Sequence, residues 1–231
     1  MFKEKPEITN SIELRGRLSG DFVFSHEIYS EKFYSFTVEV PRLSKASDFL
    51  PVTISEKLIK DMDFKIGSLV DIFGQVRSYN NYVQTEGRNR LLITVFAREM
   101  LYAKDENGEN IEGEDENSPN NVYLNGFICK PPIFRQTPFG REISDILLAV
   151  NRSYNKSDYI PCICWGRNAR YVSDLKVSDN IVLHGRMQSR QYQKKLENGQ
   201  ILEKTAYEIS VSKIETPDGV EDIVDGEREE Q

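Results

Sequence analysis

The sequence predicts an all-β protein built from two copies of one unit, and two observations carry this prediction. Residues 12–18 alternate strictly between polar positions and apolar or glycine positions, as a half-buried strand does. The same pattern returns 110 residues later, at 122–128. The chain therefore contains a repeated unit that is rich in strands.

The repeat extends well beyond this first strand. Three further pairs of segments match, namely 38–42 with 148–152, 48–54 with 158–164, and, after one inserted residue, 70–78 with 181–189. The period is far longer than the repeat of a solenoid, so the pattern indicates a duplicated domain. With 231 residues, of which 39% are hydrophobic, the chain has room for two domains with packed cores.

The elements of the second copy follow an order that identifies its fold. We predict strands near 121–128, 143–150, 159–165, 180–189 and 204–214, with a helix near 167–175. Five strands with one helix between the third and the fourth is the order of the OB-fold, a five-stranded Greek-key barrel. We therefore predict two tandem OB-fold domains, each with one short helix.

Glycines recur inside the predicted strands of both copies, at Gly16 and Gly74 and again at Gly126 and Gly185. Glycine weakens a strand but permits the sharp bend at the corner of a small barrel. Bulges in an ordinary sandwich are the alternative explanation. The recurrence at the same strand positions favours the barrel.

Charge divides the chain into four parts. Residues 1–104 and 121–216 carry net charges of +1 and +5, whereas 105–120 and 217–231 carry −7 and −6. The overall charge of −7 therefore comes from two polar segments that cannot supply a core, and the second copy is basic. We predict an acidic flexible linker over 105–120 and an acidic disordered tail over 217–231. Simple solubility explains both segments as well as a partner-binding role does.

Several classes of function find no support in the sequence. It contains no phosphate-binding loop, G-x-G-x-x-G, H-E-x-x-H or G-x-S-x-G motif, and its two histidines, His26 and His184, are far apart. We predict a protein that is not an enzyme and needs no cofactor or metal. No apolar run is long enough to span a bilayer and the N-terminus is charged, so we expect a cytoplasmic, nucleoid-associated protein without membrane contact. The three cysteines lack a paired spacing and are expected to be free thiols.

Aromatic rings and basic residues alternate along the second copy. In its third predicted strand Tyr159 and Trp165 share one face, while the cysteines take the core face. At the rise of a strand these two rings lie about 20 Å apart. Tyr154 precedes this strand and Tyr192 follows the next one. Turn signals at 135–141 and 197–199 predict the two hairpins that flank the groove of an OB-fold.

Basic residues surround these rings. They are Arg135, Arg141, Arg152, Arg167, Arg186, Arg190, Lys194 and Lys195. Rings can stack on bases and cations can contact phosphates, and together they bind single-stranded nucleic acid without reading its sequence. A single Tyr or Trp is more often a core residue, and scattered Arg and Lys usually form a solvated face. Four rings and eight basic residues on one small barrel favour the binding interpretation.

Residues 120–215 resemble the bacterial single-stranded DNA-binding protein family, whose members coat single strands during replication and repair. The resemblance rests on motifs in the family's order and spacing: Asn121-Val-x-Leu-x-Gly126, Arg135-x-Thr-Pro-x-Gly140, Leu148-Ala-Val-Asn-Arg152, Asp158-Tyr-Ile-Pro-Cys162, Trp165-Gly166 and Gly185-Arg-x-Gln-Ser-Arg190. It implies that Tyr154, Tyr159, Trp165 and Tyr192 stack on bases. It also implies sequence-independent binding and protection of single-stranded DNA in replication, recombination or repair.

Residues 8–103 resemble this domain more weakly. Serines stand at the positions of two rings, Ser44 for Tyr154 and Ser55 for Trp165. The other two rings have counterparts in Phe49 and in Tyr79 or Tyr82. We expect the first copy to bind DNA poorly on its own and to complete the assembly, so that a homodimer supplies the four barrels of the family's tetramer.

The C-terminus departs from the family as well. It reads Arg228-Glu-Glu-Gln231, without the apolar tip through which family members recruit repair proteins. Binding of replication or repair proteins by that route is therefore doubtful. The main alternative function is a non-catalytic OB-fold scaffold or replication accessory protein that mainly binds other proteins.

Overall fold

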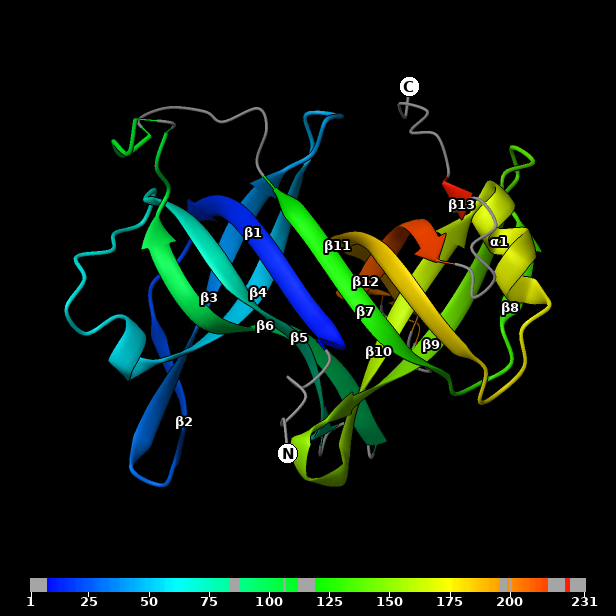
Figure 1. Cartoon of the computed structure of the whole chain (residues 1–231), viewed down its shortest axis with the longest axis horizontal. Helices are drawn as coiled ribbons and strands as arrows, with labels where there is room; N and C mark the ends of the chain where they lie inside the picture. The colour runs from blue at the N-terminus through cyan, green and yellow to red at the C-terminus, as the bar shows by residue number, and fades with distance from the viewer. Residues whose placement is uncertain are drawn as a thin grey trace, which may run out of the picture.

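Two β-barrels lie side by side, the first half of the chain forming one and the second half the other (Figure 1). The computed structural model describes residues 8–83, 88–105, 107–111, 119–195, 199, 201–215 and 223–224. Among these, the side chains of 81–83, 88–90, 194–195 and 223–224 are not described. The predicted all-β, two-domain architecture is confirmed.

The N-terminal barrel is formed by the first six strands. These are β1 (Asn10–Leu18), β2 (Val23–Ile28), β3 (Glu31–Pro41), β4 (Ser47–Ser55), β5 (Leu69–Val83) and β6 (Arg88–Tyr102), with a 3-10 turn, η1 (Glu56–Leu58), after β4. The strands close in the order β1-β3-β4-β6-β5, and only β4 and β6 in this ring run parallel. Strand β2 extends the ring as a hairpin with β3.

The C-terminal barrel repeats this order. Its elements are β7 (Asn120–Ile128), β8 (Ile133–Gln136), β9 (Glu142–Arg152), the turn η3 (Ser153–Asn155), β10 (Lys156–Trp165), α1 (Gly166–Ser173), β11 (Asn180–Lys195) and β12 (Ile201–Glu215). They close in the order β7-β9-β10-β12-β11, again with one parallel pair, β10 and β12. A two-residue strand, β13 (Ile223–Val224), pairs with β12.

The helical elements of the two barrels differ. In the C-terminal barrel α1 lies between β10 and β11, as predicted, and buries Asn168, Ala169 and Val172. In the N-terminal barrel the same position holds only the turn η1, which buries none of its residues. It begins at Ser55, whose Oγ accepts the backbone N–H of Lys57 at 3.3 Å. The short helix predicted for the N-terminal barrel is thus replaced by a single 3-10 turn, although Leu58 and Ile59 of this segment still pack against the core.

Equivalent apolar residues form the two cores. Leu14 and Leu50 have no exposed surface, and neither do their counterparts 110 residues later, Leu124 and Ile160. The duplication seen in the sequence is therefore also a duplication of packing. The cysteines of β10 lie in the C-terminal core, and burial raises the pKa of the Cys162 thiol well above its usual value. Such a thiol is a small buried hydrophobe and not a nucleophile.

Gly74 and Gly185 mark the same irregularity in both barrels. The β5–β6 ladder shifts register at Gly74, and the β11–β12 ladder shifts at Gly185. A Cβ at either position would lie against a carbonyl oxygen of the neighbouring strand, that of Phe96 or Ser210. Each glycine thus sits at a bulge within a closed barrel, so the two explanations offered for the repeated glycines both apply.

Strands β1 and β7 join the barrels into one continuous sheet (Figure 1). They run antiparallel, and Ile12 lies directly opposite Val122. The sequence repeat also equates Ile12 with Val122, so a pseudo-twofold axis passes between these two residues. Each barrel therefore presents equivalent residues to the other, as in a symmetric dimer.

The described part of the predicted linker folds into a turn. The Asp105 carboxylate accepts the backbone N–H groups of Asn107 and Glu109, both at 2.9 Å, and these contacts, that of Glu109 first, lower its pKa. Lys104 and Asn110 form a β-bridge across the turn. Residues 112–118 of the linker and, apart from β13, the tail lie outside the described residues.

Candidate nucleic-acid interface

The outer face of the C-terminal barrel presents two of the predicted rings. Tyr159 and Trp165 both lie on β10 and point away from the core, because the side chains at 160, 162 and 164 point inward. Tyr159 is 44% exposed. Trp165 is partly exposed, and its Nε1–H donates to Ser210 Oγ at 3.3 Å. Both rings are accessible from solvent on one side of the sheet.

Tyr154 projects from the turn η3, between β9 and β10. It is 95% exposed, and its backbone lies in the left-handed region at φ 63° and ψ 37°. An aromatic residue rarely adopts this conformation, which costs of order 1–3 kcal/mol. The turn therefore holds the ring away from the barrel, where a base can reach it.

Tyr192 lies on the part of β11 that continues beyond the barrel as a hairpin with β12. It is 38% exposed and pairs with Lys204 across the hairpin. Alternation along the strand gives it the same facing as Arg190. Lys194 and Lys195 follow on β11, but their side chains lie outside the described residues.

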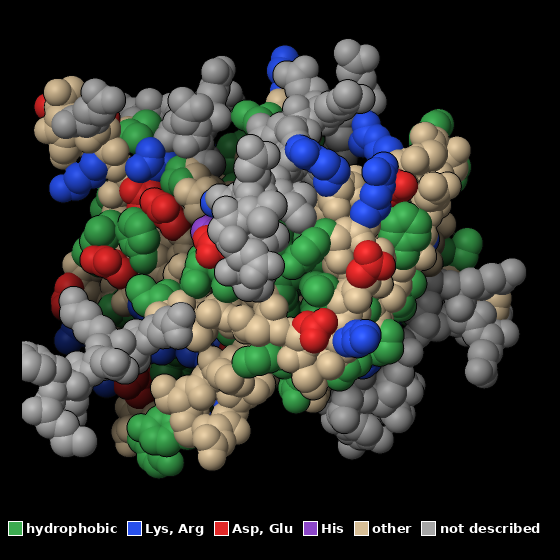
Figure 2. Space-filling model, turned by 45° about the vertical axis from the view of Figure 1, so that its right-hand side comes forward, with side chains coloured by type: hydrophobic (Ala, Val, Ile, Leu, Met, Phe, Trp, Pro, Cys, Tyr) green, Lys and Arg blue, Asp and Glu red, His purple; other side chains and the backbone are tan. Residues whose placement is uncertain are grey.

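Carboxylates accompany the basic residues on this face. Arg135 donates from Nε to Asp145 Oδ2 at 2.9 Å, and this hydrogen bond raises the pKa of the guanidinium. Arg190 lies 3.4 Å from Glu208 Oε1, which also accepts the side-chain amide of Gln188 at 2.9 Å. Figure 2 shows basic, acidic and hydrophobic side chains interspersed on the side of the molecule that it brings forward. The face is therefore less positive than the count of bases suggests.

Arg141 and Arg167 are exposed at two edges of the barrel. Arg141 closes a turn whose main chain is fixed by its own contacts: its N–H donates to Thr137 Oγ1 at 3.0 Å, and Gly140 adopts φ 78°. Arg167 lies in the first turn of α1, directly after Trp165 and Gly166.

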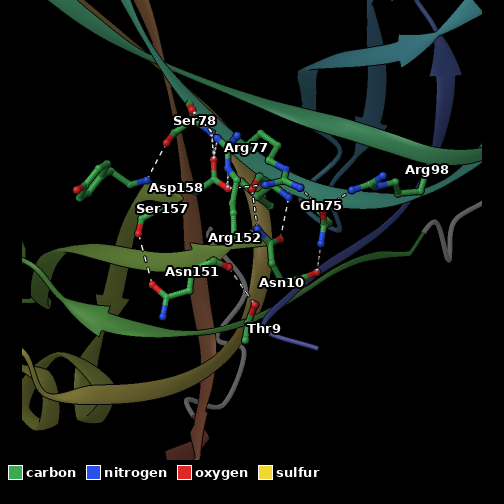
Figure 3. A network of polar contacts seen from close by, with 12 residues as sticks. Thr9, Asn10, Gln75, Arg77, Ser78, Arg98, Asn151, Arg152, Ser157 and Asp158 are labelled. Carbon is green, nitrogen blue, oxygen red and sulfur yellow. Dashed lines mark hydrogen bonds and ion pairs between the residues drawn. The ribbon is translucent and has the colours of Figure 1, made fainter. Parts of the chain in front are cut away.

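Arg152 belongs to the junction between the barrels. It donates to the carboxylate of Asp158, from Nε at 2.6 Å, and to the carbonyl oxygen of Ser78 at 3.0 Å (Figure 3). Asp158 is fully buried and also binds Arg77 of the N-terminal barrel at 3.1 Å. Burial lowers the pKa of Arg77, and the charge of Asp158 opposes that shift.

Arg186 takes part in the second contact of the junction, which the pseudo-twofold axis relates to the contact around Asp158. Asp48 of the N-terminal barrel is fully buried, binds Arg42 at 2.6 Å and accepts the backbone N–H of Ser189 at 2.6 Å. Arg186 Nη1 lies 3.8 Å from the same carboxylate. Two predicted site residues, Arg152 and Arg186, thus have carboxylate partners at the junction.

The residues of this junction recur in the sequence repeat. Arg42, Asp48 and Ser78 recur as Arg152, Asp158 and Ser189. A single sequence does not show that these polar residues are buried or that each set reaches into the other barrel. The exposed bases and the junction bases therefore could not be separated in advance.

Only some of the residues equivalent to the four rings are aromatic in the N-terminal barrel. Phe49 is 48% exposed and Tyr79 is 38% exposed, with its hydroxyl 3.5 Å from Thr53 Oγ1. Ser55 binds the Glu31 carboxylate at 2.6 Å. The side chain of Tyr82 lies outside the described residues.

Within the residues that the structure describes, no group of three or more side chains could hold a metal ion. In the same part of the chain no helix combines the length and apolar character needed to cross a membrane.

Comparison with known proteins agrees with this geometry. Residues 119–217 match the single-strand binding protein family, which covers the C-terminal barrel from β7 to the end of β12. The match covers less than half of the chain, so it shows what the C-terminal barrel is similar to. The match includes every ring and base described above for that barrel.

Two curated proteins are similar to part of the chain. Single-stranded DNA-binding protein A of Bacillus subtilis is 36% identical over 81 residues, which are 32% of this chain and 47% of that protein. Single-stranded DNA-binding protein 2 of Listeria monocytogenes is 35% identical over 81 residues, which are 32% and 51%. The chain spans about half the length of the curated relatives that it matches.

A solved structure resembles the whole two-barrel arrangement. The single-stranded DNA binding protein from Thermus aquaticus superimposes with a TM-score of 0.67 over 96% of both chains, at 16% sequence identity. At that identity the likeness shows the fold alone. It extends the shared architecture to the N-terminal barrel, which the family match does not reach.

Proposed function

We propose that this chain binds single-stranded DNA without reading its sequence, through the outer face of the C-terminal barrel. The observation that carries the proposal is the pair Tyr159 and Trp165, both accessible on one face of β10. Stacking on such rings contributes about 1–3 kcal/mol per base and tolerates every base. The names of the relatives, each called a single-stranded DNA-binding protein, support the same ligand.

The basic residues divide into two roles under this proposal. Arg141, which is exposed, contacts phosphates, and Arg167, also exposed, is a further proposed phosphate contact. Arg135 and Arg190 reach phosphates only by weakening their bonds to Asp145 and Glu208, so they contribute less. Lys194 and Lys195 are also proposed phosphate contacts, on the hairpin beyond Tyr192.

Arg152 and Arg186 act indirectly. Arg152 bridges the barrels through the carbonyl oxygen of Ser78, and Arg186 does so beside the Asp48 carboxylate, so both help to hold the barrels at a fixed angle. Because Asp158 immediately precedes Tyr159, this junction also fixes where the ring face begins.

The assembly that we propose is a homodimer with four barrels, which acts in the cytoplasm on single strands exposed during replication, recombination or repair. It has no catalytic step. The N-terminal barrel contributes to this assembly as a structural partner of the C-terminal one.

The test uses Trp165, the only tryptophan in the chain. Adding oligo-dT at low salt should quench its fluorescence, because a stacked base covers the indole. Absence of quenching would contradict the proposal and favour a scaffold that binds other proteins. Double-stranded DNA of the same length serves as the control, since its bases are already stacked and cannot reach the ring.

A further inference from the structure

Two strands form the ends of the continuous sheet. The sheet order runs from β2 at one end to β8 at the other, and Figure 1 shows these strands on opposite sides of the molecule. Within the described residues β2 pairs only with β3, and β8 pairs only with β9. An edge strand presents unpaired N–H and C=O groups, so each end of the sheet is a template for a further strand.

The two edge hairpins are equivalent in the repeat. Val23 of β2 lies opposite Ser35 of β3. Ile133, the counterpart of Val23 110 residues later, lies opposite Asp145, the counterpart of Ser35. The two hairpins therefore share one register, and the pseudo-twofold axis between β1 and β7 also relates β2 to β8.

Each hairpin exposes apolar side chains at the same three positions. The equivalent pairs are Val23 and Ile133, Phe24 and Phe134, and Tyr29 and Phe139. All six side chains are exposed, and the two turn rings, Tyr29 and Phe139, are 100% and 94% exposed. An exposed apolar edge strand is a site of association, because a second strand can pair with its backbone and cover its side chains.

Charge distinguishes the two hairpins. Residues 20–35 hold three acids and one lysine, a net charge of −2, whereas residues 130–145 hold three bases and two acids, a net charge of +1. The lysine, Lys32, lies across the ladder from Glu27. Two exposed acids of the first hairpin and two exposed bases of the second have no ion-pair partner within the described residues, and these are Asp21, Glu27, Lys130 and Arg141.

The difference in charge selects one contact between copies. An edge contact of β2 with β2 brings acids together, and one of β8 with β8 brings bases together, so both are disfavoured. A contact of β2 with β8 brings opposite charges together and covers the apolar residues of both edges. The partner that fits each edge is therefore the other edge of a second copy of this chain.

An antiparallel register satisfies both kinds of side chain. The bulge in β2 places Phe24 and Glu27 on one face, since their partners on β3 are two residues apart. If Phe24 lies opposite Ile133 of a second copy, an apolar pair forms at the centre of the contact. Glu27, three residues after Phe24, then falls beside Lys130, three residues before Ile133. One register therefore joins an apolar pair and an ion pair across the contact.

We propose that copies of this chain associate through these edges, with β2 of one copy pairing antiparallel to β8 of the next. Each copy has one edge of each kind, so the contact is heterologous and repeats into an open assembly without a fixed size. Both strands are short, so a single contact is weak and forms at high protein concentration and low salt. This surface adds to the proposed homodimer and does not depend on the proposed binding of DNA.

The test follows the mass of the full chain without nucleic acid, by sedimentation velocity over a series of protein concentrations. At low salt the mean mass of the wild type should rise with concentration. About 1 M salt, where the Debye length is about 3 Å, should return it to the mass of the dilute protein. A mass that stays constant over the series at low salt would overturn the proposal.

Charge reversal identifies the two edges. Asp21→Lys/Glu27→Lys makes the first edge basic, and Lys130→Glu makes the second edge acidic. Each variant then carries two edges of like charge, so alone it should keep the mass of the dilute protein. Mixing the two variants should restore growth, because each offers the edge that the other lacks. Growth of either variant alone, or none in the mixture, would overturn the proposal.

A matched control separates the edges from net charge. Asp61→Lys/Glu109→Lys changes the charge of the chain by the same amount as Asp21→Lys/Glu27→Lys, at two exposed acids outside both edge hairpins. It should associate like the wild type. Equal loss of association in the control and in the edge variant would also overturn the proposal, since net charge and not the edges would then limit association.

Discussion

The Asp158 carboxylate accepts the backbone N–H of Ser78 at 2.6 Å, although the two residues are 80 positions apart and lie in different barrels. Asp48 makes the same contact with Ser189, also at 2.6 Å. A side chain that binds main chain fixes the position of a strand, not only of another side chain. These paired contacts therefore set the angle between the barrels, and with it the position of Tyr159 beside Ser78.

Asp158→Ala should destabilise the fold strongly. Asp158 is fully buried, and its removal leaves Arg152 and Arg77 partly buried without a counter-charge. We expect the free energy of unfolding in urea to fall by about 3–5 kcal/mol. Asp145→Ala is the matched control: it breaks an ion pair with Arg135 whose side chains are 38% and 47% exposed, and should cost at most about 1 kcal/mol. Equal losses in the two variants would contradict a special role for the junction.

The barrels could be predicted from the sequence because their signals are local. Alternation along each strand and the repeat of Leu14 as Leu124 define which side chains face the core, and the core confirms them. The pairing of exposed charges is not local. Glu208 lies 18 residues from Arg190 and Asp145 lies 10 from Arg135, and no periodicity marks either contact.

The sequence predicted only those rings of the candidate site that occupy the expected strand positions. Tyr159 and Trp165 lie on the outer face because strand alternation places them there. The ring pair Phe33 and Phe96 of the N-terminal barrel escaped prediction because the two residues lie on the strands that flank β4, and their contact, with centroids 5.8 Å apart, exists only in the folded chain.

Tyr159→Ala combined with Trp165→Ala should lower single-strand affinity by about 30-fold or more, because two stacking surfaces are lost. Fluorescence anisotropy of labelled oligo-dT measures this without the tryptophan signal. Both rings point away from the core, so the urea midpoint should change little. Phe73→Ala, a partly exposed ring in the groove over β1 and β7, is the control and should bind like wild type. An unchanged isotherm for the double variant would remove these rings from the site.

Arg141→Ala should reduce the salt dependence of binding more than Arg135→Ala does. A cation that contacts phosphate releases counterions, which gives a slope of about −0.7 in log K against log salt for each contact on a single strand. Arg135 already pairs with Asp145, whereas Arg141 is exposed. Titrations between low and moderate salt measure both slopes. A flat response of the wild-type protein, or equal changes in the two variants, would argue against this division of the bases.

Deleting residues 217–231 should leave affinity at low salt level or raise it, because the deletion removes a net charge of −6 that repels phosphate. The deletion also removes β13, which pairs Ile223 with Ile214 of β12. Ending the chain at Val224 instead keeps β13 and removes a net charge of −3, so it separates the effect of charge from that of the strand pair. If charge dominates, the longer deletion should raise affinity more than the shorter one, and 0.3 M salt should erase the difference because the Debye length then falls to about 6 Å. A marked fall in affinity on either deletion would show instead that the tail assists binding.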